Sequence, residues 1–484
     1  MEDRYIATVD MGTSKIGLCV AKVTGENVQI LYYKESPAAG MRYGRILNPI
    51  KAGEALKAAV HEAEESLDIK ILQVVIGLPR YEVTQETATA TLEHSNELTC
   101  ITQEEIDAVK NLALDTYPLK NPEKETIFGA AAQSFNTDDT INCTEEDVVG
   151  MPSKTLVGNF KAFIGTKKAS DNIDIMLNSA GIAPAKKLFL PTSTASAVLS
   201  PEARENGVAL IEMGAGVTSV TIYRGNILRY YGAIPFGGNN ITADIKYECG
   251  FTTHLAENIK LAYGACMPDK LLSMSDKILQ INNSETGIDQ QLSVKYLSEI
   301  ITARVREIVE AILFLIQESG YADLLRAGVV LTGGCANLAN CGNLIKEMSG
   351  YNVTTGFPCV RRFSFIGCPD IAETGAVASI GMLMVAKDDE HLNCTTEYIP
   401  PKTEEEIAAE EEMQKSEEER LKEEEENRKG SVFDEEGWEK TQPEKKDKGA
   451  KRAAKDRKSP LKVTWEKTSH AITGVLEKFY DTAE

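Results

Sequence analysis

The sequence predicts an α/β fold in which one structural unit occurs twice, and three observations support this class. An apolar run at 208–211 leads into Glu212-Met213-Gly214-Ala215-Gly216-Val217 and then into a second apolar run. The N-terminal segment 5–20 repeats this pattern, which indicates an internal duplication. A third apolar run, 328–332, enters two glycines ahead of a helical pattern. Short apolar runs bounded by glycine are typical of buried strands that end in tight turns.

The second copy, 207–225, predicts a β-hairpin whose tip carries Gly214-Ala215-Gly216. At such a tip, backbone N–H groups can approach an anion because no large side chain intervenes. The carboxylate of Glu212 lies just before the glycines and can hold a hydrated divalent cation against that anion. Taken alone, the same pattern is also that of a plain β-hairpin without a ligand.

The first copy has the same order of features. An apolar run at 5–9 ends on Asp10, and Met11-Gly12-Thr13-Ser14-Lys15 then precedes a second strand-like run. Two facing hairpins of this kind can clamp a phosphate chain from both sides, with Asp10 and Glu212 sharing a cation through water. The candidate phosphate-binding residues are Asp10, Gly12, Thr13, Ser14, Lys15, Glu212, Gly214, Ala215, Gly216 and Val217.

The other elements follow from hydrophobic spacing and capping signals. A capping box, Thr102-Gln103-Glu104-Glu105, predicts the start of a helix. Taken in order, the spacing predicts strands at 5–10, 16–22 and 28–33, a helix at 50–66, a buried strand at 69–78, strands at 126–134 and 154–164, and helices at 170–187 and 296–317. In the helix at 170–187, the residues expected to face inward are Ile173, Ile175, Met176 and Ala180.

The third glycine-bearing stretch suits a backbone that lies flat against an adenosine, and it adds Gly333, Gly334 and Asn337 to the candidate site. In this order, the three stretches resemble the phosphate-1, phosphate-2 and adenosine motifs of the actin, Hsp70 and sugar-kinase ATPase superfamily. Segments 190–197 and 373–381 resemble its two connecting helices. The resemblance implies an actin-like fold of two ribonuclease-H-like halves, with ATP and Mg²⁺ bound between them.

A narrower resemblance comes from the N-terminal part. The turn Gly40-Met41-Arg42-Tyr43-Gly44, the helix at 50–66 and the strand at 69–78 resemble the FtsA family of bacterial cell-division proteins rather than actin, Hsp70 or a sugar kinase. In that family a small α/β subdomain replaces the one found in actin. The resemblance implies the first part of an actin-like subdomain 1A at 1–94, an inserted FtsA-type subdomain 1C at 95–168, a return to 1A at 169–205, and the second half, 2A and 2B, at 206–388.

Three residues of the second half complete the candidate nucleotide site. Gly238 lies near the start of an expected helix, where small residues let phosphate approach the helix N-terminus. On the next helix, the superfamily resemblance implies that Glu257 and Lys260 flank the ribose and base. A salt-bridged surface pair at i, i+3 is the alternative for these two residues.

Composition excludes several other classes. The formal net charge of the 484 residues is −21, which argues against nucleic acid as the main partner, because phosphate backbones require a basic face. The ten cysteines are scattered without metal-ligand spacing, as in reduced cytosolic proteins. The acidic start, Met1-Glu2-Asp3-Arg4, predicts no signal peptide, and no apolar run reaches the ~18 residues of a spanning helix.

Beyond residue 388 the composition changes. Segment 402–428 is dominated by glutamate and 444–458 by lysine and arginine, so we expect a charged disordered linker at 389–458. Segment 459–484 places apolar residues on one face at helical spacing, directly after the basic run, as interfacial membrane anchors do. The expected membrane-binding residues are Leu461, Trp465, Ile472, Val475, Leu476 and Phe479. A helix that docks on the core or on a partner is the alternative.

The FtsA resemblance implies a function for this arrangement, since that family ends in a membrane-targeting amphipathic helix. It implies an ATP-binding protein that polymerises on the cytoplasmic face of the bacterial cell membrane at the division site. Implied partners are further copies of the chain, the tubulin-like protein FtsZ, later division proteins and an anionic membrane surface. The alternative is a soluble sugar-kinase-like or Hsp70-like ATPase with a partner-binding C-terminal helix. Because the sequence offers no convincing aspartate base, we assign no catalytic residue.

Departures from the superfamily pattern predict slow or absent ATP hydrolysis. Glu212 stands where aspartate is usual, and Val217 replaces a hydroxyl-bearing residue that can bond a phosphate oxygen. Leu190 and Thr192 lie near the place where related ATPases carry a polar water-activating residue. Positioning the attacking water is a large part of phosphoryl-transfer catalysis.

Overall fold

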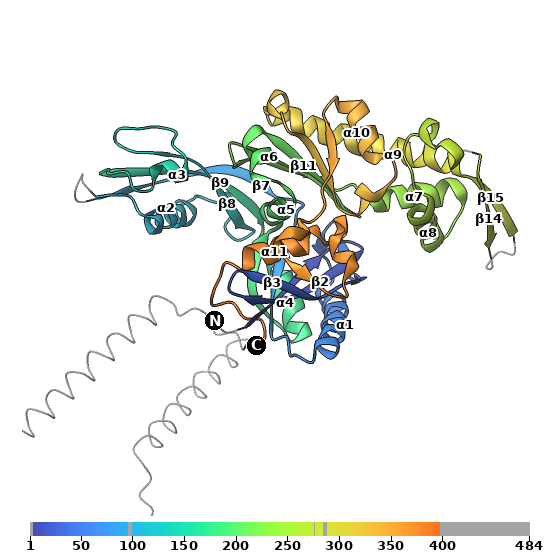
Figure 1. The fold of residues 1–484 in the computed structure, drawn as a ribbon, viewed down its shortest axis with the longest axis horizontal. Coiled ribbons are helices and arrows are strands. Elements are labelled where there is room, and N and C mark those ends of the chain that lie inside the picture. Colours follow the sequence, from blue (N-terminus) through green and yellow to red (C-terminus); the bar gives the residue numbers. More distant parts are fainter. Residues whose placement is uncertain (1–2, 95–98, 275, 284–287, 397–484) are drawn as a thin grey trace, which may run out of the picture. The chain divides into compact units, whose positions relative to one another are not determined.

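The computed structural model describes residues 3–94, 99–274, 276–283 and 288–396 (Figure 1), all of which belong to one compact unit, Met1–Ile399. Most of the expected linker and the whole expected membrane-binding helix, with its six apolar residues, lie outside the described residues. No helix within the described part of the chain is long and apolar enough to cross a membrane.

The first half is built on a six-stranded sheet in the order β10-β6-β1-β2-β3-β18. An antiparallel meander comes first in the chain, and two strands then pair in parallel beside β1. The strands are β1 (Arg4–Met11), β2 (Lys15–Thr24), β3 (Asn27–Pro37), β6 (Gln73–Leu78), β10 (Ala183–Phe189) and β18 (Ser364–Phe365). The very short strands β4 (Met41–Arg42) and β5 (Arg45–Ile46) form a separate turn.

The second half repeats this topology in a five-stranded sheet, β13-β12-β11-β16-β17. Again a meander is extended by two parallel strands, here beside β11. The strands are β11 (Val208–Met213), β12 (Thr218–Arg224), β13 (Ile227–Ile234), β16 (Gly328–Thr332) and β17 (Val353–Thr355). The predicted duplication of an α/β unit is therefore confirmed.

Helices cover both faces of the first sheet. They are α1 (Pro49–Leu67) and α4 (Lys167–Ala180) on one face, and α5 (Leu190–Val198) and α11 (Val377–Ala386) on the other. The strand alternation explains this arrangement, because Val9 belongs to the same buried cluster as Leu56 of α1, whereas Ile6 belongs to the cluster of Leu190 of α5. Helices α5 and α11 lie side by side (Figure 1), and a Cβ at Gly381 would clash with the Ser193 carbonyl.

Four helices cover one face of the second sheet. These are α7 (Gly238–Cys249), α8 (Thr253–Tyr263), α9 (Val294–Glu318) and α10 (Cys341–Ser349), which share a core with Ala209 and Ile211. The alternate residues, Val208 and Leu210, belong to the core of the first half instead. The two halves are thus packed on each other through the second sheet. Helix α6 (Pro201–Asn206) joins α5 to this sheet, and the hairpin of β14 (Ile278–Asn283) and β15 (Ile288–Ser293) precedes α9.

A third unit is inserted between β6 and α4. Its sheet has the order β7-β9-β8, formed by β7 (Thr84–Glu93), β9 (Thr155–Thr166) and β8 (Glu125–Asn136), with α2 (Gln103–Asp115) and α3 (Glu145–Val148) beside it. The capping box of α2 is confirmed, because Thr102 Oγ1 accepts from Glu105 N and Glu105 accepts from Thr102 N. This sheet begins before the expected boundary at residue 95, since β7 pairs with β9 along its whole length.

One predicted helix is wrong in its extent. Helix α4 ends at Ala180 rather than 187, because Gly181 adopts a left-handed conformation (φ 75°) and caps it, and β10 follows. Ile175, which was expected to face inward, has 48% of its surface exposed. The expected strand at 69–78 likewise begins only at Gln73. The predicted helices at 50–66 and 296–317 are confirmed as α1 and α9 to within a few residues.

Candidate functional site

Two β-hairpins of the same geometry join β1 to β2 and β11 to β12. In each, the glycine that follows the methionine donates its N–H to a carbonyl three residues later: Gly12 to Lys15 and Gly214 to Val217, both at 2.9 Å. A Cβ at Gly12 would lie 2.8 Å from the Lys15 oxygen, and one at Gly214 would lie 3.0 Å from the Val217 oxygen. The first turn therefore requires glycine, and the second leaves little room for any other residue at the matching position.

The two hairpin tips face each other across the gap between the halves. A Cβ at Gly216 would lie 2.6 Å from Thr13 Oγ1 and 3.1 Å from Thr13 Cβ. Thr13 cannot readily move away, because its Oγ1 accepts a hydrogen bond of 2.8 Å from the Gly44 N–H. The two tips, which the sequence predicted to face each other, therefore lie close together.

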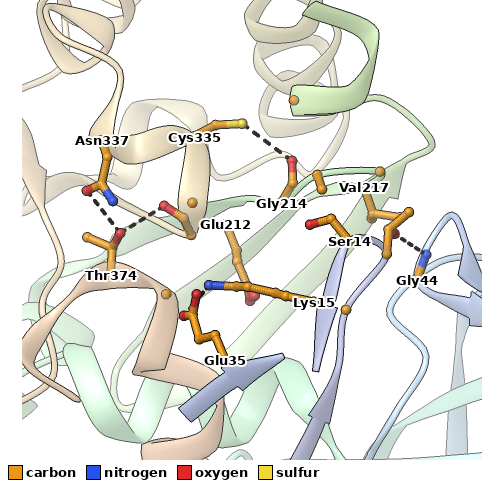
Figure 2. A pocket seen from close by; sticks show the side chains of 18 of the residues that line it. Ser14, Lys15, Glu35, Gly44, Glu212, Gly214, Val217, Cys335, Asn337 and Thr374 are labelled. Atoms are coloured by element: carbon orange, nitrogen blue, oxygen red, sulfur yellow. Dashed lines mark hydrogen bonds and ion pairs between the residues drawn. The ribbon is translucent and has the colours of Figure 1, made fainter. Parts of the chain in front are cut away.

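A cavity of about 410 Å³ opens beside these tips (Figure 2). Every residue that the sequence analysis assigned to the nucleotide site lines it: Asp10, Gly12, Thr13, Ser14, Lys15, Glu212, Gly214, Ala215, Gly216, Val217, Gly238, Glu257, Lys260, Gly333, Gly334 and Asn337. Lining residues that the sequence analysis did not assign are Glu35, Gly44, Arg80, Leu261, Gly264, Cys335, Leu338, Thr374, Gly375 and Ala378. A cavity of this size is typical of small-molecule and cofactor sites.

The third glycine-rich segment is fixed against the second hairpin. Gly333 has φ 88°, and a Cβ there would lie 2.5 Å from the Met213 oxygen, so this position also requires glycine. The Thr374 hydroxyl is 3.0 Å from the Gly333 oxygen and 3.2 Å from Asn337 Oδ1 (Figure 2). Residues of the second connecting segment therefore hold one wall of the cavity in place.

Lys15, the one basic residue of the first hairpin tip, extends along the cavity to Glu35 (Figure 2). The Tyr33 hydroxyl donates to the same carboxylate at 2.9 Å. A Cβ at Gly375 would clash with the Lys15 ammonium group, so the start of the second connecting helix leaves room for this side chain. Glu35 was missed because it lies on β3, far along the chain from the motifs.

Lys260 and Glu257 form a pair at 2.7 Å and both line the cavity. Lys260 is only 7% exposed, so the surface pair considered as an alternative does not describe it. Its ammonium also donates to Thr242 Oγ1 at 2.8 Å and to the Gly238 carbonyl at 3.1 Å. Lys260 therefore ties α8 to the start of α7 and has its charge satisfied by protein groups.

The start of α7 contributes differently from what its glycines suggested. The Gly238 N–H donates to the Gly214 carbonyl at 3.0 Å, and the Asn239 N–H donates to the Ala215 carbonyl at 2.7 Å. These amides dock the helix on the second hairpin and are not directed to a ligand. Gly238 lines the cavity by being small, because a Cβ there would lie 2.8 Å from Cys335 Sγ.

The two hairpin carboxylates share an arginine that the sequence analysis missed. Arg80 follows β6, and its Nη2 lies 2.7 Å from Glu212 Oε1 while its Nη1 lies 3.5 Å from Asp10 Oδ1. The three side chains are 12–16% exposed. Burial raises the pKa of Glu212 above its ordinary value; Arg80 lowers that pKa and Asp10 raises it.

This arrangement does not fit the Mg²⁺ that Asp10 and Glu212 were expected to hold through water. The guanidinium of Arg80 already bridges these carboxylates, so we derive no step through a metal at this place. In the described part of the chain, no cluster of three or more His, Cys, Asp or Glu residues could hold a metal ion.

The residues considered for water activation lie away from the cavity lining. Leu190 is 2% exposed and packs against Gly77, and the Thr192 hydroxyl donates to the Phe189 carbonyl at 2.7 Å. Val217 does line the cavity, and its side chain offers no hydrogen-bonding group to a ligand (Figure 2). Neither of these two residues, nor Val217, therefore offers a polar side-chain group to the cavity.

Comparisons with known proteins agree with this arrangement. The family model described as cell division protein FtsA matches residues 209–379. FtsA of Neisseria meningitidis is 27% identical over 360 residues, which cover 74% of this chain and 84% of the relative. FtsA of Borreliella burgdorferi is 29% identical over 359 residues, which cover 74% and 86%.

Among solved structures, the PilM-PilN type IV pilus biogenesis complex is similar in fold alone, with a TM-score of 0.54 and 14% identity, over 78% of this chain and 98% of the other. The duplicated sheets, the facing hairpins and the sequence matches agree with one another. The chain is similar to the FtsA family of bacterial cell-division proteins and has an actin-like α/β fold.

Proposed function

We propose that the chain binds ATP between its two halves and acts as a membrane-associated, actin-like scaffold in bacterial cell division. The observation that carries this proposal is the pair of facing glycine hairpins beside a cavity of about 410 Å³. The relatives supply the process, because the similar proteins of Neisseria meningitidis and Borreliella burgdorferi are cell-division proteins.

The cavity offers suitable partners for each part of a nucleoside triphosphate. Phosphate oxygens can be bound by backbone N–H groups of the hairpin tips, by the hydroxyls of Thr13 and Ser14, and by the Lys15 ammonium. The glycine pair Gly333-Gly334, which starts a 3-10 turn and brings no side chain to the cavity, suits the nucleoside, with Lys260 and Glu257 also lining the cavity. A magnesium ion that accompanies ATP would be bound mainly by the phosphates, since Arg80 already occupies the two hairpin carboxylates.

A scaffold suits the site better than a metabolic kinase. A kinase needs a carboxylate free to accept a substrate proton, but Asp10 and Glu212 are both engaged by Arg80. The alternative, a soluble sugar-kinase-like or Hsp70-like ATPase with a partner-binding C-terminal helix, would require these groups to rearrange. The names of the relatives also favour the scaffold.

The finer parts of the proposal rest on the sequence. The chain polymerises on the cytoplasmic face of the cell membrane at the division site, anchors the FtsZ ring there and recruits later division proteins. The helix at 459–484 binds anionic lipid behind the basic run 444–458. Within the body, the expected divisions at 1–94, 95–168, 169–205 and 206–388 provide the first half, the inserted unit and the second half.

Flotation of the full chain on anionic liposomes, with and without ATP, tests this function. We expect the protein to float, to form filaments on the lipid when ATP is present, and to lose most membrane binding in Trp465→Glu. Trp438→Glu is the matched control, because it places the same charge on the other tryptophan of the sequence, within the expected linker. If Trp438→Glu and Trp465→Glu float equally well, the helix is not the anchor. If ATP does not bind, the proposed function is refuted.

A further inference from the structure

We propose that Arg80 is a built-in counter-cation that takes the place of a protein-bound divalent ion between Asp10 and Glu212. The inference deepens the proposed nucleotide-binding function and rests on it for its consequence, although the geometry stands alone. It concerns how the phosphate end of the cavity is neutralised.

The first support is the geometry of the bridge. One guanidinium reaches Glu212 at 2.7 Å and Asp10 at 3.5 Å, and all three side chains are largely buried. Arginine keeps its charge at every accessible pH and carries a planar fork of five N–H donors, which suits two acceptors at once. Nη1 donates to Asp10 and Nη2 makes its contact with Glu212 as an ion pair, whereas the buried Nε has no hydrogen-bond partner among the described residues.

The second support is that Arg80 is held in place from the other half. It follows β6 of the first half, and Tyr231 of β13 in the second half donates its hydroxyl hydrogen to the Arg80 carbonyl oxygen. The Tyr231 N–H also donates to Gln85 Oε1 at 3.1 Å. A residue of the second half therefore holds the segment that carries Arg80 in the first half.

The third support is the distribution of charge in the cavity. The other two cations of the lining each have an acid of their own, because Lys15 pairs with Glu35 and Lys260 pairs with Glu257. Asp10 and Glu212 share Arg80 alone among the basic residues of the lining. Without its guanidinium, two largely buried carboxylates would face each other uncompensated, which is costly and attracts a divalent ion.

The consequence is a testable difference in metal dependence. With Arg80 present, Mg²⁺ has no protein carboxylate pair to bind here, so nucleotide binding depends little on the metal. When Arg80 is replaced by a neutral residue, the exposed carboxylate pair becomes a metal site, and Mg²⁺ stabilises the folded chain even without nucleotide.

Thermal unfolding of the full chain without nucleotide tests the bridge directly. On adding millimolar MgCl₂, we expect no shift in the midpoint for the wild type and a rise of about 2 °C or more for Arg80→Gln. Arg45→Gln is the matched control, since it removes an arginine that pairs with Glu82 outside the cavity lining, and it should show no shift. Adding Asp10→Asn to Arg80→Gln should abolish the gain, because one carboxylate of the pair is then lost.

A second arm measures binding of a fluorescent ATP analogue in MgCl₂ and in EDTA. The wild-type affinity should change by less than about threefold, and Arg80→Gln should bind at least about tenfold more tightly with Mg²⁺ than without it. A wild-type chain that Mg²⁺ stabilises without nucleotide, or that loses tenfold or more in affinity in EDTA, overturns the inference even if Arg80→Gln fails to fold. Absence of nucleotide binding under both conditions would refute the proposed function instead, and the thermal arm would still decide the role of Arg80.

Discussion

The two hairpins have the same backbone and opposite side-chain chemistry. Both tips close through a glycine N–H bonded to a carbonyl at 2.9 Å, and both follow a strand that ends near an acid. The first tip carries Thr13, Ser14 and Lys15, whereas the second carries Ala215, Gly216 and Val217. The duplication has therefore preserved the shape of the clamp and concentrated its polar side chains on one side.

Close packing explains why the second tip carries only small or apolar side chains. Gly216 lies against Thr13, so any side chain there would intrude on the first hairpin. The carbonyls of Gly214 and Ala215 are used to dock α7. The second hairpin thus forms a wall that fits the first, while the first carries the groups that we propose to hold phosphate.

The largest effect should come from breaking the fit between the tips. In Gly216→Ala, the new Cβ would lie 3.1 Å from Thr13 Cβ, and Thr13 is held by Gly44, so the hairpins must separate. We expect affinity for a fluorescent ATP analogue to fall by about 100-fold, which is the upper range of overpacking costs.

Gly342→Ala is the control for this change, because its Cβ would meet only Val353 Cγ1 at an ordinary 3.6 Å. Its affinity for the analogue should equal that of the wild type. If Gly216→Ala also binds as the wild type does, the tips do not form a clamp.

A smaller change in ATP affinity should distinguish the first tip, which carries polar side chains, from the second, which does not. Lys15→Met removes the only ammonium of the first tip, and a charge-assisted hydrogen bond to phosphate corresponds to about a 10–30-fold loss in ATP affinity. Isothermal titration with ATP and with adenosine checks this, because adenosine binding should be unchanged. The matched change at the other tip, Val217→Ala, should alter ATP affinity by less than about threefold. Equal losses of ATP affinity in Lys15→Met and Val217→Ala would show that the two tips contribute equally to phosphate binding.

Local signals explain how much of this site the sequence predicted. The glycines that close each turn and the acids before them are adjacent in the chain, so the hairpins and the duplication could be predicted from pattern alone. Arg80 and Glu35 could not, because each meets the site through folding of distant segments and neither lies in a recognisable motif. The end of α4 was missed for a local reason, since the cap depends on a left-handed Gly181.

The smallest change in ATP affinity should come from adding a hydroxyl group to the tip of the second hairpin. Val217→Thr preserves the shape of the side chain and adds one group that can bond a phosphate oxygen, so ATP affinity should rise by about 2–5-fold. Hydrolysis should remain slower than about 0.01 per second in both proteins, far below ordinary kinases, because neither Leu190 nor Thr192 lines the cavity. Release of inorganic phosphate measures this rate.

Robust turnover in the wild type that Asp10→Ala abolishes would contradict the prediction of slow hydrolysis. Turnover gained only in Val217→Thr would show instead that one hydroxyl is enough to position water. The second hairpin would then slow hydrolysis through Val217 as well as pack against the first hairpin. If affinity rises while phosphate release does not, binding and hydrolysis are set by different parts of the site, and the second hairpin contributes to binding alone.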